Sequence, residues 1–349
     1  MKSPSDSAHS WLSALAFVAA FVGVCAAISS RLPFPDVPIA RPKIEHLARH
    51  HDDYDTLLLG SSRIAYQIIP SIFDAETTAH ALPTRTFNAA IAGMNPPEDA
   101  YFLDTILRHP PRSLRWVVLE LASLGTGVDR TRGTIRSVYW RDWERTALVF
   151  RRLLAPRIDS KKTGWKFTRQ RLVEEWPRLL DFLEMWGERA TNLGRGTPFT
   201  DRLLKPHAPA EETTFEDGGW VRADRPEPMA GSDLAEYQRE LAERREKPAV
   251  EHSSDAVSQE SLARMIGKIE RLGARAVLVV PPTTSKRNFV PLPATMSRSL
   301  VLDFSDIEKF PELYRLEHRL DTDHLNTEGS KIFSRLIARR IAEESRAHP

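Results

Sequence analysis

The sequence predicts an α/β fold in which helices cover both faces of a central parallel sheet. Short apolar runs of strand length alternate along the chain with longer segments of helical pattern, and strands that are apolar throughout are typical of buried parallel sheets. The 349 residues are 41% hydrophobic and 28% charged, which is typical of a soluble globular body with one large domain or two ordinary ones.

Five segments have the pattern of buried strands. In the first, the leucines at 57–59 form an apolar run that is long enough for a strand and too short for a helix, and Gly60 ends it. The fourth is stopped by the proline pair at 281–282. The five predicted strands span residues 55–60, 86–91, 115–121, 274–280 and 300–304.

Helical segments flank these strands. Residues 97–107 begin with Glu98 and Asp99, which suit the first turn of a helix because the helix dipole favours negative charge there. Residues 258–272 and 327–345 form the helices beside the late strands. This alternation of strands and helices predicts a parallel sheet covered on both faces.

Residues 130–255 interrupt the alternation, and we interpret them as an insertion into an α/β domain made of 54–129 and 256–349. The insertion is either a largely helical cap over the edge of the sheet or partly disordered decoration. Its helical patterns lie near residues 142–154, 168–190 and 233–246. Its tryptophans are candidates for stacking on sugars, with packing as the ordinary alternative. These are Trp140, Trp143, Trp165, Trp176, Trp186 and Trp220.

The N-terminal segment is apolar from residue 11 to residue 28 apart from Ser13, which is near the lower length limit for crossing a bilayer. A signal anchor over residues 1–30, forming a transmembrane helix, is the favoured interpretation. A cleaved signal peptide and a buried core helix are the alternatives. The first two predict a periplasmic body, either held by a single pass in the inner membrane or secreted. Residues 31–53 are predicted to be a proline-containing linker that leads into a short helix.

Composition also excludes some classes of function. The formal net charge of +2 predicts no nucleic-acid partner. Cys25 is the only cysteine, so neither an intramolecular disulfide nor a cysteine-built zinc site can form. We interpret His46, His50 and His51 as surface residues near a helix end, and we expect no metal and no other cofactor.

A serine pair follows the first predicted strand in the order Gly60, Ser61, Ser62, Arg63. A strand, a sharp turn and a helix N-terminus present a hydroxyl at the carboxyl edge of a sheet, where α/β folds place ligands. The free N–H groups and positive dipole end of the helix can stabilise an oxyanion. A turn or a helix cap is the alternative role of these serines.

Three segments in order, residues 60–62, 88–93 and 321–326, resemble the SGNH/GDSL hydrolase superfamily. The resemblance covers about 54–121 and 274–345. It implies a three-layer α/β/α, flavodoxin-like SGNH fold with Ser62 as the nucleophile and with the backbone N–H groups of Ser62 and Gly93 as oxyanion donors. The last segment, Asp-x-x-His followed by Leu-Asn-x-x-Gly, is the most specific. It matches Asp321, His324 and Gly329.

The resemblance implies a Ser-His-Asp triad. His324 would accept the proton of Ser62, and Asp321 would orient His324. Asp323 is the alternative orienting residue. A polar loop that caps the last helix, with Thr327 as its N-cap, is the alternative interpretation of the whole segment.

One segment departs from the family pattern. The family has an asparagine after the third strand that donates to the oxyanion, whereas residues 119–123 read Leu-Glu-Leu-Ala-Ser. Loss of one such donor costs about 3–4 kcal/mol of transition-state stabilisation. We expect Asn95, or else Ser123, to replace it, and not Glu120, because a carboxylate repels an oxyanion. Arg63 and Asn88 are expected to bind substrate.

The chain has an N-terminal apolar segment, then Gly-Ser-Ser-Arg at 60–63, and a late Asp-x-x-His-Leu-Asn at 321–326. This order of features is similar to that of membrane-tethered SGNH-like proteins of polysaccharide O-acetylation and teichoic acid D-alanylation. That similarity implies an O-acyltransferase or O-acetylesterase that acts through an acyl-enzyme on a cell-envelope glycan or acylated substrate, with a membrane-bound O-acyltransferase as partner. A catalytically weak or inactive domain that binds glycan or scaffolds the transferase is the second hypothesis. A membrane-anchored α/β protein with no site here is the third.

Overall fold

The computed structural model describes residues 4–31, 37–121, 136–140, 142–154, 176, 180, 183, 215–225, 227–246, 256–284 and 300–347. The chain divides into two compact units. The first comprises residues 1–37, 127–154 and 162–210, and the second comprises 38–126, 155–161 and 211–349.

The first unit contains three of the described helices: α1 (Pro4–Arg31), α6 (Arg136–Tyr139) and α7 (Trp143–Leu154). Helix α1 includes the apolar segment expected to cross a membrane. No helix among the described residues combines the length and apolarity of a membrane span, so the expected transmembrane helix has no support from the structure. Most of the helix predicted at 168–190 lies outside the described residues.

The second unit is built on a five-stranded parallel sheet with the strand order β2-β1-β3-β4-β5. The α/β fold predicted from the sequence is confirmed, and each strand lies inside its predicted segment. The strands are β1 (Thr56–Leu59), β2 (Thr86–Asn88), β3 (Trp116–Glu120), β4 (Arg275–Val280) and β5 (Leu300–Asp303). In this doubly wound order ligands bind at the carboxyl ends of the strands, beside the switch point between β1 and β3.

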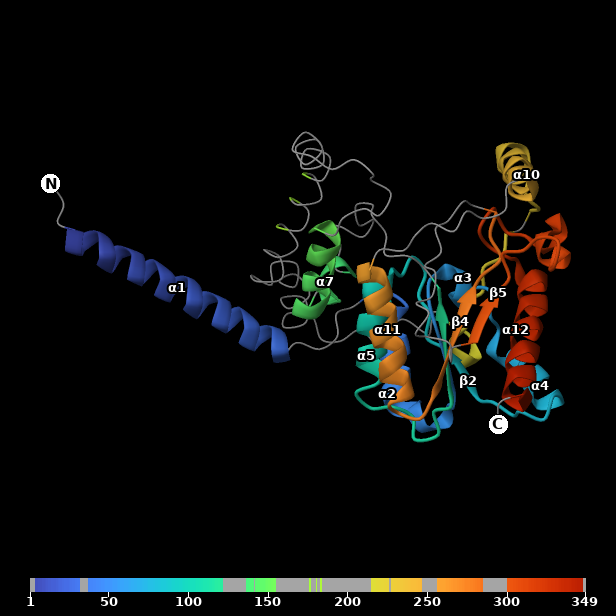
Figure 1. Ribbon diagram of the computed structural model, residues 1–349, viewed down its shortest axis with the longest axis horizontal. Helices are drawn as coiled ribbons and strands as arrows, with labels where there is room; N and C mark the ends of the chain where they lie inside the picture. The colour runs from blue at the N-terminus through green and yellow to red at the C-terminus, as the bar shows by residue number, and fades with distance from the viewer. Residues whose placement is uncertain are drawn as a thin grey trace. The chain divides into compact units, whose positions relative to one another are not determined.

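Helices cover both faces of the sheet (Figure 1). Helices α2 (Ala40–His50), α5 (Pro96–Ile106) and α11 (Ala256–Glu270) lie on one face, and α4 (Pro70–Ala79) and α12 (Thr327–Ala347) lie on the other. On the α12 side, Phe73, Phe333 and Ile337 pack with Leu58 and Val118 in a fully buried apolar core. Burial of these side chains holds the carboxyl edge of the sheet in place.

The predicted linker at 31–53 includes helix α2 and the short η1 (His51–Asp53). Lys43 of α2 is completely buried, and its ammonium donates hydrogen bonds to the carbonyl oxygens of Asn88 (2.8 Å) and Ala90 (2.6 Å). Burial lowers the pKa of Lys43 well below its usual value. Helix α2 is thus fastened to the segment that follows β2.

Part of the predicted insertion belongs to the second unit. The segment containing η2 (Asp217–Gly219) meets the core through Trp220, whose indole N–H donates to the Tyr66 carbonyl at 2.8 Å. Helix α10 (Gly231–Glu246) places the Tyr237 hydroxyl 2.6 Å from the carbonyl oxygen of Tyr314 in η4 (Pro311–Tyr314). Trp140 and Trp220 are buried, which favours packing over sugar stacking for these two.

Candidate active site

The turn after β1 requires a glycine. Gly60 has a φ of 151°, and a Cβ atom added there would lie 2.6 Å from the Cγ1 of Ile64 and 2.7 Å from the Cβ of Glu120. Ser61 is the N-cap of the short helix α3 (Ser62–Ala65), and its Oγ accepts a hydrogen bond from the Arg63 N–H at 3.4 Å. Ser61 therefore takes the capping role and leaves the Ser62 hydroxyl to face outward from the sheet edge.

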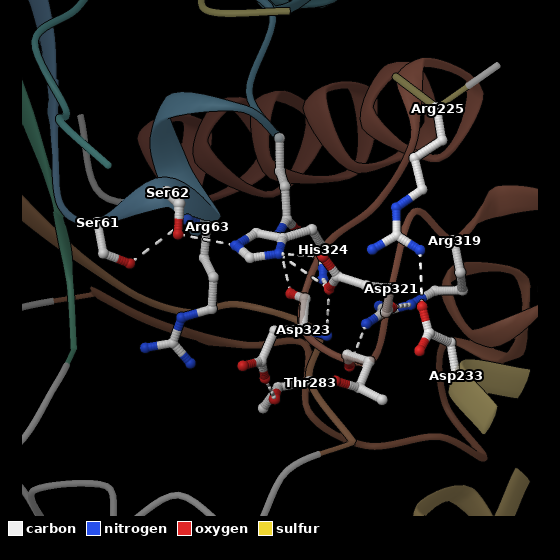
Figure 2. Close-up of polar contacts among 12 residues, drawn as sticks. Ser61, Ser62, Arg63, Arg225, Asp233, Thr283, Arg319, Asp321, Asp323 and His324 are labelled. Atoms are coloured by element: carbon white, nitrogen blue, oxygen red, sulfur yellow. Dashed lines mark hydrogen bonds and ion pairs between the residues drawn. The ribbon is translucent and has the colours of Figure 1, made fainter. Parts of the chain in front are cut away.

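Figure 2 shows a continuous chain of polar contacts from Ser62 to Asp321. The Oγ of Ser62 lies 2.7 Å from the Nε2 of His324. The Nδ1 of His324 lies 2.9 Å from each carboxylate oxygen of Asp321. An ionised carboxylate can only accept, so Nδ1 holds the proton and Nε2 accepts from the Ser62 hydroxyl. This is the arrangement that a serine nucleophile needs.

Asp321 is held in its ionised form. Burial opposes ionisation, but the hydrogen bond and charge of His324, with the backbone N–H groups of Asp323 and His324, keep the pKa of Asp321 below its ordinary value. Those two N–H groups each donate to its Oδ1 at 2.8 Å. The backbone of its own loop thus holds the Asp321 carboxylate in position to accept from the His324 imidazole.

Asp323, the alternative orienting residue, has other contacts. Its Oδ1 accepts from the Thr283 hydroxyl at 2.8 Å, and its backbone carbonyl accepts from the Gln67 amide at 3.1 Å. The structure therefore pairs His324 with Asp321.

Thr327 was considered as the N-cap of α12, but Asn326 takes that role. The Oδ1 of Asn326 accepts from the Gly329 N–H at 3.0 Å, which is the bond of an N-cap. Thr327 instead donates its N–H (3.1 Å) and hydroxyl (2.8 Å) to Asp224. Gly329 is the residue required at its position, because an added Cβ would lie 2.3 Å from the carbonyl oxygen of His318. Asn326 therefore caps α12, whereas His324 makes the contact with Ser62.

The second motif lies beside the serine turn. The N–H of Ile91 donates to the Gly60 carbonyl at 3.0 Å, and the N–H of Met94 closes a turn onto Ile91 at 3.0 Å. Gly93 occupies the third position of that turn with a φ of 72°, a conformation that favours glycine. Its backbone is exposed, as an oxyanion donor must be.

Of the two residues expected to replace the missing asparagine, the structure describes Asn95. The Oδ1 of Asn95 caps α5 by accepting from the Glu98 N–H at 3.0 Å, which leaves the Nδ2 group as the donor it can offer. Ser123 lies outside the described residues. The N–H of Ser62 is in the first turn of α3, where backbone donors have no partner within the helix.

Asn88 and Arg63 were expected to bind substrate. Both are buried beneath the serine turn and support its backbone. Asn88 is fully buried, and its Nδ2 donates to the carbonyl oxygens of Ile64 and Ile68, both at 2.9 Å. Its Oδ1 accepts from the Ala90 N–H at 3.1 Å. Asn88 thus fixes the backbone after Ser62, and with no exposed surface it has none to offer a substrate.

Glu120, at the end of β3, supports the serine turn in a way that the sequence analysis missed. Its side chain is 1% exposed and pairs with the Arg63 guanidinium. Its second oxygen accepts from the Ser61 N–H at 2.7 Å. The pair neutralises the charge that was expected to repel an oxyanion. The Nε and Nη1 groups of Arg63 are buried and have no hydrogen-bond partner among the described residues.

No metal site is apparent in the described part of the chain. His46 stacks on Phe87, with ring centroids 5.1 Å apart, and its Nε2 lies 2.8 Å from the Tyr54 hydroxyl. No three His, Cys, Asp or Glu side chains of the described residues gather in an arrangement that could bind an ion.

The sequence was compared with models of protein families and with curated proteins, and neither comparison finds a match.

Proposed function

We propose that this protein is an SGNH-type serine acyl-transfer enzyme, with Ser62 as the nucleophile, His324 as the general base and Asp321 as the residue that orients the base. The observation that supports this most strongly is the Ser62–His324 contact of 2.7 Å between segments 262 residues apart, at the carboxyl edge of the sheet. The flavodoxin-like strand order agrees with the SGNH fold, and the asparagine missing after β3 argues against the family's usual oxyanion hole.

The reaction would proceed in two steps. The Ser62 oxygen attacks the carbonyl carbon of an ester while its proton passes to the Nε2 of His324, and the tetrahedral oxyanion is stabilised by N–H donors of the turn. The protonated histidine then gives its proton to the leaving alcohol, and an acyl-enzyme forms. Water or a sugar hydroxyl next attacks the acyl-enzyme through the same base, which regenerates Ser62 and gives an esterase or a transferase, respectively.

The substrate class and location rest on the resemblance stated above. A cell-envelope glycan as substrate, a periplasmic body and a membrane-bound O-acyltransferase partner stay predictions.

A non-catalytic glycan-binding or scaffolding domain is the second candidate. It is favoured by the sequence after β3, where Glu120 and Leu121 stand in place of the asparagine that donates to the oxyanion in the family pattern.

Labelling of the full-length protein with a fluorophosphonate serine probe distinguishes the two. We expect the wild type to be labelled, and both Ser62→Ala and His324→Ala to lose labelling. Ser61→Ala is the matched control: it removes the N-cap, at a cost of about 0.5–2 kcal/mol, but keeps the nucleophile and its labelling. A folded wild type that is not labelled, or a Ser62→Ala variant labelled as fast as the wild type, contradicts the proposed mechanism.

A further inference from the structure

Arg319 contacts the backbone of the loop that carries Asp321 and His324. Its side chain is buried, with 3% of the residue exposed. Its Nε donates to the Asp321 carbonyl at 3.2 Å, and its Nη2 donates to the Thr322 carbonyl at 2.5 Å (Figure 2). One planar side chain therefore fixes two consecutive peptide groups, those that follow Asp321 and Thr322.

The guanidinium is flanked by aromatic rings and is not paired with a carboxylate among the described residues. Its Cζ lies 5.7 Å from the ring centroid of Tyr237 and 5.9 Å from that of Tyr314. A buried cation without an ion-pair partner is costly unless other groups compensate. Here the two carbonyl groups, the two rings and the nearby charges of Asp321 and Asp323 compensate for part of that cost, while the Nη1 group is buried with no hydrogen-bond partner among the described residues. The position of Arg319 therefore depends on the elements that hold those rings.

Helix α10 holds one of these rings and is also connected to the loop through Thr284. The Tyr237 hydroxyl donates to the Tyr314 carbonyl at 2.6 Å, which joins the two rings. The Thr284 hydroxyl lies 2.8 Å from the Glu240 carboxylate of the same helix and 2.9 Å from the Thr322 carbonyl, and its one proton bonds to either acceptor in turn. The Thr284 N–H also donates to the Thr322 carbonyl at 3.4 Å. Thr322 is thus reached both from Arg319 and from α10 through Thr284.

We propose that Arg319 is a positioning residue of the Ser62 site, and that α10 acts as the support which holds it. Arg319 fixes the peptide groups of Asp321 and Thr322, so that the Asp321 carboxylate meets the Nδ1 of His324. This inference rests on the proposed acyl-transfer function, and it concerns geometry that can be measured without any substrate.

The direct test is the tautomer of His324, read from the ring ¹⁵N shifts of full-length protein with labelled histidine and assigned with His324→Gln. In the wild type we expect the proton on Nδ1, because Asp321 accepts it. Arg319→Met removes both hydrogen bonds and should shift the population toward Nε2–H. Arg315→Met is the matched control, since Arg315 is 63% exposed and lies four residues earlier. It should leave the tautomer unchanged.

Kinetics provide the second readout. Arg319→Met should lower kcat by roughly 10²-fold, the loss typical of a misplaced catalytic group, with a smaller change in KM. Arg319→Lys should recover only part of kcat, because an ammonium cannot reproduce the planar, two-donor contact. If Arg319→Met does not fold, Tyr237→Leu removes one ring face and should shift the tautomer in the same direction.

The outcomes separate the two proposals. An unchanged tautomer in folded Arg319→Met, or in Tyr237→Leu where Arg319→Met does not fold, overturns the positioning role of Arg319, whatever the enzyme does. A shifted tautomer in a protein whose wild type has neither esterase activity nor probe labelling supports the positioning role and contradicts the acyl-transfer function.

Discussion

Ser61 and Ser62 are adjacent and chemically identical, yet their environments give them different tasks. Ser61 donates its N–H to Glu120 and caps α3, whereas the Ser62 hydroxyl lies 2.7 Å from His324. The difference arises because successive residues at a helix start point in different directions. The strand, turn and helix start predicted where a reactive serine would lie, and the family resemblance implied Ser62; the capping geometry gives the physical reason why Ser62 and not Ser61 is available.

At the residue scale, Glu120→Gln tests the support beneath the turn. The substitution leaves the Arg63 cation buried without a counter-charge, so we expect the free energy of unfolding to fall by about 3–5 kcal/mol. Urea denaturation measures it. The control Glu343→Gln breaks an exposed pair with Arg340 and should cost no more than about 1 kcal/mol.

A double variant distinguishes a lost ion pair from a general packing defect. Arg63→Met removes the stranded cation, so Glu120→Gln combined with Arg63→Met should be more stable than Glu120→Gln alone. Equal or lower stability of the double variant contradicts this account of the pair.

At the scale of elements, β1, β3 and β4 could be predicted from the sequence because each contains a run of at least three buried apolar residues. The edge strands β2 and β5 give a weaker pattern, because they are short and include polar residues. Helix α4, which begins at Pro70, was not predicted, because its apolar residues are interrupted by polar ones. The roles of Glu120 and Arg319 were also missed. Both depend on contacts between segments distant in sequence, such as Arg63 with Glu120 and Tyr237 with Tyr314.

Helix α12 gives the prediction at this scale. Gly329→Ala places a Cβ 2.3 Å from the His318 carbonyl, which must move away, so we expect destabilisation of about 1–3 kcal/mol and weaker labelling of Ser62. In Gly267→Ala, the nearest atom to the added Cβ is the Arg271 Nη1 at 3.5 Å. That position lies inside α11, so alanine should stabilise the protein by roughly 0.5–1 kcal/mol.

The two substitutions should change the free energy of unfolding in opposite directions, which thermal or urea denaturation of the two variants measures. Gly329→Ala with wild-type stability means that the close approach of α12 to His318 is absent in solution.

At the scale of the whole molecule, the candidate site brings together residues that follow the first and the last strand of the chain. Ser62 follows β1, His324 follows β5, and α10 reaches the histidine loop from a region that the sequence analysis separated from the α/β domain. A parallel sheet with its ligand site at the carboxyl edge follows from the alternation of strands and helices, whereas the flavodoxin-like strand order was implied by the family resemblance. The contribution of α10 follows from neither, because a charged helix offers no sequence signal for what its few buried residues contact.

Because both halves of the site depend on the assembled sheet, probe labelling should be lost together with the fold. In a urea titration, we expect the midpoint for fluorophosphonate labelling of Ser62 to coincide with the midpoint for loss of helical circular dichroism. Loss of labelling at clearly lower urea means that the 316–326 loop opens on its own, which contradicts a site held by the whole unit.

The separation of Ser62 from His324 by 262 residues also has a consequence in time. A ribosome that adds about 5–20 residues per second needs roughly 13–50 s to reach the histidine after it has made the serine. During that interval the four strands that follow Ser62 are made, and Ser62 has the reactivity of an ordinary alcohol. The order of the chain thus delays the chemistry until all five strands of the sheet have been made.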